Sequence, residues 1–398
     1  MLKISLHPML TGQMRSLFLI SAEHGELALA EMFVRASTVM GEWRILLPPK
    51  LFGIHKDAFG GRAAQYTSLG DVTRAIEEVD PQIVVLCSAY LLSLDNLLAP
   101  REVRELLALL RARGCAIATT DPFLGLASVL TPKDVDIRYL LPGLPSWKRA
   151  LAGLARAVVG ARTKLIKVPP MDDLAHIYPT GIPERPDGIW RLSFAPPSAP
   201  SSVDASATGT PPQWLFVLAE IDMHTQLVEM ELRDFVENLL GMLRFAVAQG
   251  ARPVLIAPRL IVDRLAGATT SEMELHEHLP LTEFRTRAMD AEYVFYWNAF
   301  SLSQLERLSS ERPVFVFDRG YLSRAVAPYH EVATTCHFGG WEPKYLDQRQ
   351  LFSPYVLAHL AKQQRSAVHT IAERWRQSPT SDEMLRQLLA TADRSRSG

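Results

Sequence analysis

Two short apolar segments joined by a helix, between residues 288 and 318, constrain the fold of this chain more than any other feature. Tyr293–Tyr296 and Val314–Phe317 are apolar at every position, as strands are when both faces of their sheet are buried. The residues between them predict a short polar loop and then a helix over Leu302–Leu308. A helical crossover between two buried strands indicates a parallel sheet that is covered on both sides.

The loop after the first of these strands, Trp297–Ser301, is where an open α/β sheet would hold a ligand. It lies at the carboxyl end of its strand and opens a helix, whose free backbone N–H groups favour phosphate. We expect Ser301 and Ser303 to cap this helix, to bind phosphate, or to do both. Glu306 lies one turn inside the helix, where its carboxylate can face back toward the loop. Such an acceptor beside an anion site suits the ribose hydroxyls of a nucleotide.

Length, charge and cysteine content exclude several classes of protein. A chain of 398 residues is too long for one hydrophobic core, so we expect two domains. The formal net charge is −1 and no segment carries a dense lysine and arginine stripe, which gives no support to a nucleic-acid or anionic-membrane partner. There is no signal sequence and no apolar run of membrane-spanning length, and the three cysteines lie far apart. These features predict a soluble, cytoplasmic protein.

Strands and helices alternate in both halves of the chain, which predicts the α/β class with two Rossmann-like domains and parallel sheets. The first domain is expected over residues 1–165. A proline- and serine-rich interdomain segment follows over 166–212, because its composition cannot bury enough apolar surface to order itself. The second Rossmann-like domain is expected over 213–350, and C-terminal helices over 351–398. The other expected strands are Ser16–Ser21, Arg44–Leu47, Gln82–Cys87, Cys115–Thr119, Trp214–Leu218 and Pro253–Ala257.

A motif in the second half resembles the nucleotide-sugar site of glycosyltransferases with the GT-B fold. It consists of Ser301-Leu-Ser-Gln-Leu-Glu306 followed by Ser310-Glu-Arg-Pro-Val314. In that fold a small residue, a serine or threonine and then a glutamate stand near the start of the helix, before a strand entry such as Gly-Lys-Pro-Val. The resemblance implies that Glu306 holds the donor ribose and that two domains, acceptor first and donor second, face each other across a cleft. In this sequence Glu311-Arg312 replaces the usual Gly-Lys, and Asn298-Ala299-Phe300 replaces a glycine pair.

The first half carries a shorter match, His24-Gly25 between a strand and a helix. In several inverting members a His-Gly at this point supplies the catalytic base, and an imidazole titrates near neutrality. The competing interpretation of His24 is a helix-capping or merely exposed histidine. Glu23 is a candidate to orient or replace this base. Asp121, at the carboxyl end of a strand, is a candidate to orient the histidine or contact the acceptor, although aspartate before proline is also typical of a turn.

Three further residues are candidates for donor binding. Arg259 follows a strand, where a guanidinium can grip two phosphate oxygens, and a surface ion pair is its alternative role. Arg319 also follows a strand and can reach phosphate or sugar, and Asn298 belongs to the loop before the motif helix. His276 and His278 stand two residues apart in an expected loop, which is not the spacing of a helix-face metal site. No metal site is therefore expected.

The sequence predicts a glycosyltransferase that moves a sugar from a nucleoside diphosphate sugar to an unidentified acceptor, without a metal ion or other cofactor and with inversion. One alternative is an epimerase or hydrolase of a nucleotide sugar with the same architecture. Another is a catalytically silent GT-B-like protein that binds a nucleotide sugar or scaffolds a complex. The donor base, its sugar and the oligomeric state are left open by the sequence.

Overall fold

The chain forms two compact units, and it passes between them twice. The first unit takes residues 1–120 and 380–398, and the second takes residues 121–379. The predicted domain boundary at residue 165 lies outside the described residues, and of the predicted interdomain segment 166–212 only residues 174–178, 191–193 and 211–212 are described. The computed structural model describes residues 13–21, 24–93, 97–126, 129–140, 160–161, 174–178, 191–193 and 211–397.

The first unit is built on a parallel sheet whose strand order reverses between β1 and β4. Strands β2 and β3 lie on one side of β1, whereas β4 and β5 lie on the other. Every residue of β4 is buried, as expected for a strand covered on both faces. The strands, in spatial order, are β3 (Ala63–Gln65), β2 (Met40–Leu47), β1 (Met14–Ile20), β4 (Ile83–Cys87) and β5 (Ala116–Thr120).

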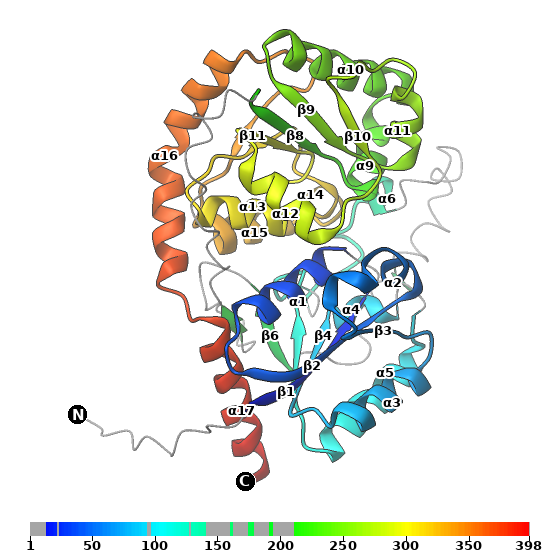
Figure 1. Ribbon diagram of the computed structural model, residues 1–398. Helices are drawn as coiled ribbons and strands as arrows, with labels where there is room; N and C mark the ends of the chain where they lie inside the picture. Colours follow the sequence, from blue (N-terminus) through cyan, green and yellow to red (C-terminus); the bar gives the residue numbers. More distant parts are fainter. Residues whose placement is uncertain are drawn as a thin grey trace, which may run out of the picture. The chain divides into compact units, whose positions relative to one another are not determined.

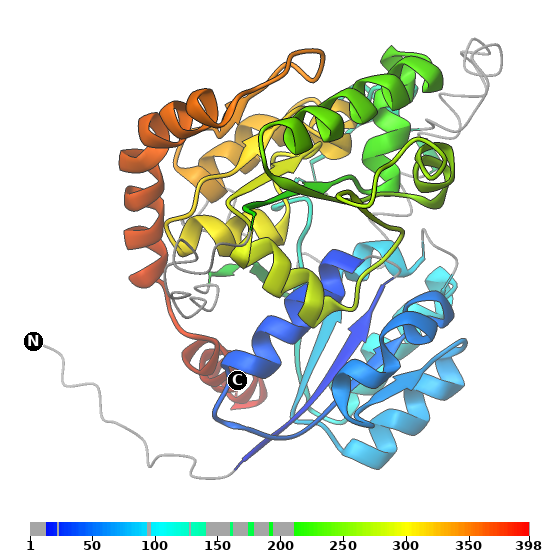
Figure 2. The ribbon, with the colours of Figure 1, turned by 45° about the horizontal axis from the view of Figure 1, so that its top comes forward.

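Helices cover both faces of this sheet (Figures 1 and 2). The first and the last helix of the chain, α1 (His24–Ala36) and α17 (Ser381–Ser397), contact each other and β4. On the other face, α3 (Leu69–Val79) contacts β1 and β2, and α5 (Pro100–Ala112) contacts β5. Pro100 starts α5 and Gly114, at φ +69°, follows its end, in agreement with the sequence. The shorter helices are α2 (Pro49–His55), the 3-10 helix η1 (Lys56–Phe59) and α4 (Ala89–Leu92).

The second unit contains another parallel sheet, in which the order reverses between β8 and β11. Aromatic rings line one face of it: Phe295 stacks on Phe216 with ring centroids 4.7 Å apart and on Phe315 at 5.7 Å. In spatial order the strands are β10 (Glu274–His276), β9 (Arg252–Ile256), β8 (Gln213–Val217), β11 (Tyr293–Tyr296), β12 (Phe315–Val316) and β13 (Lys344–Tyr345). The parallel strands β6 (Ala175–Tyr178) and β7 (Arg191–Ser193) do not belong to this sheet but continue the first sheet beyond β5.

In Figure 1, α10 covers the upper side of the second sheet, and α12 and α13 lie below it. The long helix α16 packs along α13. The helices of this unit are α6 (Ile137–Leu140), α9 (Glu220–Glu229), α10 (Leu232–Ala248), α11 (Arg259–Leu265), α12 (Leu281–Asp290), α13 (Leu302–Ser309), α14 (Tyr321–Ala325), α15 (Tyr329–Phe338) and α16 (Pro354–Arg376). None of the described helices of the protein combines the length and the apolar character needed to cross a bilayer.

The predicted α/β class with two Rossmann-like sheets is confirmed, and three local predictions are wrong. The sequence pattern over residues 228–248 predicts one helix, but Met230 and Glu231 are extended between α9 and α10. His276 lies in the edge strand β10 rather than in a loop, since this short segment pairs with β9. Residues 321–343, for which no element was expected, contain α14 and α15.

Gly320 allows two loops of the second unit to touch. Its φ is +83°, and a Cβ at this position would lie 2.9 Å from the Cα atom of Asn298. We expect Gly320→Ala to lower the free energy of unfolding by about 2–4 kcal/mol, because backbone strain and overpacking add. Gly340→Ala is the matched control, since Gly340 has φ +91° but open space around the added Cβ, and it should lose about 1–2 kcal/mol. Urea unfolding measures both, and equal losses would contradict a role for the contact.

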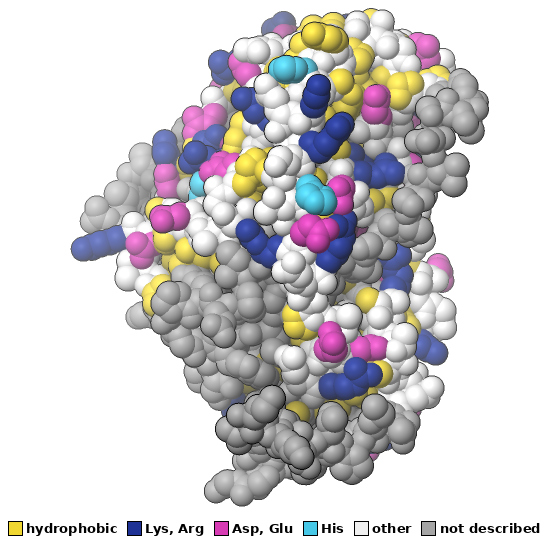
Figure 3. Space-filling model, turned by 90° about the vertical axis from the view of Figure 1, so that its left-hand side faces the viewer, with side chains coloured by type: hydrophobic (Ala, Val, Ile, Leu, Met, Phe, Trp, Pro, Cys, Tyr) yellow, Lys and Arg dark blue, Asp and Glu magenta, His cyan; other side chains and the backbone are white. Residues whose placement is uncertain are grey.

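Charged side chains of both signs are mixed on the face shown in Figure 3. Lys and Arg do not gather into a continuous stripe among the described residues of that face. Several cations are ion-paired, for example Arg287 with Glu274 at 2.7 Å and Arg233 with Glu237 at 2.8 Å. This distribution agrees with the net charge of −1.

Candidate functional site

His24 stands at the carboxyl edge of the first sheet, as the first residue of α1, and is exposed. Its Nδ1 atom lies 3.1 Å from Nε2 of His55, the last residue of α2, and the two rings meet edge to face. The His55 side chain is buried, and burial favours an uncharged imidazole. If His24 Nδ1–H donates to His55 Nε2, the basic nitrogen of His24 is Nε2. No sequence pattern indicates that His55 is the partner of His24. Glu23 lies outside the described residues.

Polar groups gather behind His24 where the strand order reverses, between β1 and β4. The buried Glu26 accepts a hydrogen bond from the Thr120 hydroxyl, which in turn accepts the backbone N–H of Ser88. The hydroxyls of Ser21 and Ser88 are fully buried and have no hydrogen-bond partner among the described residues. Open α/β sheets bind ligands at such a reversal. These hydroxyls are therefore candidates for contact with a hydroxylated acceptor.

Asp121 follows β5 and has an imidazole partner that the sequence did not reveal. Its Oδ2 atom lies 2.7 Å from Nδ1 of His176 in β6, and both side chains are buried. The same carboxylate accepts the backbone N–H groups of Phe123 and Gly125, and so closes the turn after the strand. Asp121 thus orients His176. That Asp121 also orients His24 stays a prediction.

Ser301 and Ser303 are both tied into the start of α13. Ser301 is the N-cap residue and accepts the backbone N–H of Gln304, which confirms its expected capping role. The two serine hydroxyls lie 3.2 Å apart, and Ser303 also accepts a hydrogen bond from the Tyr296 hydroxyl at 3.0 Å. Burial raises the pKa of Tyr296 to about 12, so this hydroxyl stays a donor at neutral pH.

The loop that replaces the glycine pair, Asn298-Ala299-Phe300, is held by its own unit. The backbone N–H of Phe300 donates to Asn298 Oδ1 at 2.8 Å, and that of Ala299 donates to the Arg319 carbonyl at 3.4 Å. The Phe300 ring is buried and stacks on Phe338 with centroids 5.5 Å apart. Two backbone donors that a phosphate could use at a helix start are therefore already engaged.

Glu306 is buried and forms an ion pair with Arg285 of α12, which the sequence did not predict. A carboxylate oxygen is a group that can accept hydrogen bonds from ribose hydroxyls. Contact with a ribose stays a prediction.

The two candidate phosphate arginines lie at the surface. Arg259 is the first residue of α11, and its side chain is 75% exposed and 3.5 Å from Asp263 one turn later. This arrangement is the surface ion pair that was the alternative role predicted for Arg259. Arg319 is exposed after β12, and its guanidinium has no hydrogen bond or ion pair to the described residues.

A hydrogen-bond network around Asp318 occupies the carboxyl edge of the second sheet. The buried Asp318 carboxylate accepts Arg324 Nε and Nη2 at 2.7–2.9 Å, the Gln226 side-chain amide, and the backbone N–H of Arg319 at 2.7 Å. Partial burial lowers the pKa of Arg324, but these bonds to Asp318 outweigh it and raise the pKa above its usual value. The network continues from Arg324 to the Tyr139 hydroxyl at 3.1 Å.

On its other side the network reaches the loop after β11. Gln226 accepts a hydrogen bond from the side-chain amide of Gln348 at 3.0 Å, and Gln348 accepts the indole N–H of Trp297 at 2.9 Å. At the far end Tyr139 is bonded to Glu229. Gln226, Gln348 and Tyr139 were not predicted from the sequence, because their partners in the network are far away in the chain.

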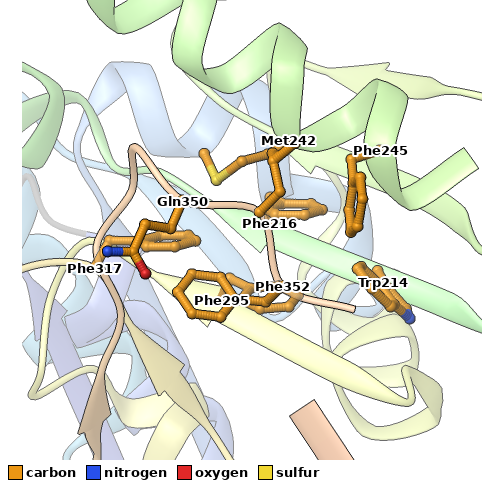
Figure 4. A pocket seen from close by; sticks show the side chains of 9 residues that line it. Trp214, Phe216, Met242, Phe245, Phe295, Phe317, Gln350 and Phe352 are labelled. Atoms are coloured by element: carbon orange, nitrogen blue, oxygen red, sulfur yellow. The ribbon is translucent and has the colours of Figure 1, made fainter. Parts of the chain in front are cut away.

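A small apolar pocket lies beneath α10, against β8 and β11 (Figure 4). In this view Met242 and Phe245 extend from the helix toward the aromatic face of the sheet, and Phe352 covers it from a neighbouring segment. No titratable group lines the pocket, so it offers no acid or base for catalysis. Its lining residues are Trp214, Phe216, Met242, Phe245, Phe295, Phe317, Gln350, Leu351 and Phe352.

One group of described side chains has the spacing for a metal ion. Ligand atoms of Glu311, His369 and Glu373 lie within 4.8 Å of one another. However, Arg376 is ion-paired with both glutamates, and His369 lies 3.1 Å from Glu311. The Arg376 guanidinium thus supplies the positive charge that a metal ion would supply in this exposed network. The expected metal independence stays a prediction.

Comparison with solved structures identifies the fold. The rhamnosyltransferase SpnG of spinosyn is 11% identical, with 94% of this chain and 99% of that chain covered and a TM-score of 0.52. The glycosyltransferase of kitacinnamycin is 14% identical, with 94% and 97% covered and a TM-score of 0.50. UDP-glucose:anthocyanidin 3-O-glucosyltransferase in complex with UDP is 8% identical, with 96% and 99% covered and a TM-score of 0.50.

Neither a family model nor a curated protein matches the sequence. The structural likeness at such low identity concerns the fold, and it agrees with the two parallel sheets described above. The chain therefore has the fold of the GT-B glycosyltransferases, without assignment to a particular member.

Proposed function

We propose that the chain is a glycosyltransferase that moves a sugar from a nucleoside diphosphate sugar to an acceptor hydroxyl, with inversion and without a metal ion. The observation that carries this proposal is the exposed His24 imidazole, held through Nδ1 by His55 at the carboxyl edge of the first sheet. In a GT-B fold, a histidine with that tautomer is suited to serve as a general base.

The proposed reaction moves one proton and one glycosyl group. His24 Nε2 takes the proton of the acceptor hydroxyl while its oxygen forms a bond to the anomeric carbon. The bond from that carbon to the phosphate oxygen breaks, and the nucleoside diphosphate leaves with the electron pair. Attack from the face opposite the leaving group inverts the configuration. Glu306, which is paired with Arg285, would accept hydrogen bonds from the ribose.

A ligand-binding and turnover experiment tests the proposal. At least one nucleoside diphosphate should raise the melting temperature of the full chain, because a ligand specific to the folded state stabilises it by mass action. Glu306→Gln should reduce that shift, whereas Glu283→Gln, at an exposed glutamate of α12, should retain it. No stabilisation by any nucleoside diphosphate, and no transfer from a panel of nucleotide sugars, would sink the proposal.

A second candidate function is a catalytically silent GT-B-like protein that binds a nucleotide sugar or scaffolds a complex. The engaged N–H groups of Ala299 and Phe300 favour it, because they leave the loop fewer donors for a diphosphate. Calorimetric binding of a nucleoside diphosphate without turnover would select this candidate. Release of free sugar in the absence of an acceptor would instead favour the hydrolase alternative.

A further inference from the structure

The Asp318 carboxylate sits in a complete set of anion-binding donors. The Arg324 side chain donates two N–H groups, the Gln226 amide donates a third, and the backbone N–H of Arg319 donates a fourth. Guanidinium, amide and backbone N–H groups are also the groups that bind a phosphoryl oxygen. The Asp318 side chain is 4% exposed, so its carboxylate binds these donors from the buried side.

This set of donors lies where a ligand can reach it. It follows β12 at the carboxyl edge of the second sheet, the edge at which open α/β sheets bind ligands. The Arg324 side chain is 34% exposed, although its partner is buried. The exposed Arg319 adds a second positive charge beside it. A ligand can therefore approach Arg324 from solvent, while Asp318 approaches it from the protein interior.

The local charge explains why an anion would compete with Asp318. Glu229 lies 3.9 Å from Arg324 and is bonded to Tyr139, so one negative charge stays near the guanidinium in any case. Once the Asp318 carboxylate is removed or turned away, one negative charge is lost beside Arg324 and Arg319, and unused donors remain. Such a site favours a phosphate or diphosphate group.

We propose that the donors around Asp318 form an oxyanion site for a phosphoryl group, which the Asp318 carboxylate occupies internally. Displacement of Asp318 from Arg324 opens the site. This inference rests on the proposed function in one respect: the natural occupant would be the diphosphate of the sugar donor.

Pyrophosphate is the probe that tests the site, in titrations of the full chain followed by calorimetry. Asp318→Ala should bind pyrophosphate at least tenfold more tightly than the wild type, and the double variant with Arg324→Ala should lose that gain. Asp347→Asn is the matched control, because Asp347 is an exposed acid at the same sheet edge and its carboxylate accepts hydrogen bonds from Arg349 and Gln350 rather than from Arg324. A folded Asp318→Ala variant that binds no more tightly than the wild type would overturn the proposal.

Two further measurements test the oxyanion site if the Asp318→Ala variant does not fold. If Asp318→Ala does not fold, Asp318→Asn preserves the shape of the side chain and should show the same gain in affinity. If neither variant folds, thermal shifts of the wild type with millimolar pyrophosphate are compared with those of Arg324→Ala, and an equal response in both overturns the proposal.

The same variants separate this inference from the proposed function. If no nucleoside diphosphate binds the wild type, but Asp318→Ala binds pyrophosphate through Arg324, the oxyanion site stands and the transferase proposal falls. If UDP or another nucleoside diphosphate binds the wild type and Arg324→Ala equally well, the oxyanion site falls and the transferase proposal stands.

Discussion

Replacement of His24 with alanine is expected to lower kcat for sugar transfer by about 10²–10⁴-fold, the usual contribution of a general base. The Kd for the nucleoside diphosphate should stay unchanged, because His24 belongs to the first unit and the donor motif belongs to the second. Steady-state kinetics and calorimetry on the same preparation measure the two quantities. A His24→Ala variant with wild-type kcat would end the assignment of this residue as the base.

His55 provides the companion measurement, since it contacts His24 and is itself buried. We expect His55→Ala to lower kcat less than His24→Ala does and to shift the pH dependence of kcat/KM, because the imidazole of His24 loses its orienting partner. A purely structural role for His55 would lower the stability without moving the pH profile. His278→Ala, at a half-exposed histidine of the second unit, serves as the control and should change neither quantity.

Arg307→Met should lower the free energy of unfolding by about 3–5 kcal/mol, the range for breaking a buried polar network. The Arg307 side chain is fully buried in α13 and donates hydrogen bonds to the backbone carbonyls of Ala288, Ala291 and Pro313. Its removal leaves these carbonyls without donors, at a cost of about 1–3 kcal/mol each. The substitution also removes a buried positive charge, which offsets part of this cost. Burial disfavours that charge, since it lowers the pKa of Arg307 to about 10.

Urea unfolding, followed by circular dichroism, measures the effect of Arg307→Met. Arg233→Met is the control, because Arg233 also lies on a helix but its side chain is 86% exposed and pairs with Glu237 one turn away. That variant should lose less than about 0.5 kcal/mol. Equal losses in the two variants would show that the carbonyl contacts of Arg307 contribute little.

The regular elements were predictable where local sequence determines them. β11 begins and ends as predicted because Tyr293–Tyr296 is apolar on both faces, and α16 lies in the region of the predicted C-terminal helices, where Ser353 and Pro354 define its start. The break at Met230 was not predictable, since the hydrophobic pattern continues from α9 into α10. The short strands β10 and β13 depend on pairing with a neighbour, which single-sequence patterns do not report.

The candidate site shows the same division between local and distant contacts. Capping of α13 by Ser301 depends on residues three positions apart and was predicted. The partners of Asp121 and Asp318 lie 55 and 92 residues away, at His176 and Gln226, so their hydrogen bonds follow from the topology of the sheets. The pairing of Glu306 with Arg285 likewise requires α12 and α13 to pack together.

The return of the last helix to the first unit has a consequence for biosynthesis. Met384, Leu385 and Leu388 of α17 are buried, and the helix packs on β4 and β5. During translation these residues emerge after the whole second unit, residues 121–379, has been made. The first unit therefore completes its core only after the second unit has all of its residues. A chain truncated just before residue 380 should have a first unit with an incomplete core, which makes it prone to aggregation.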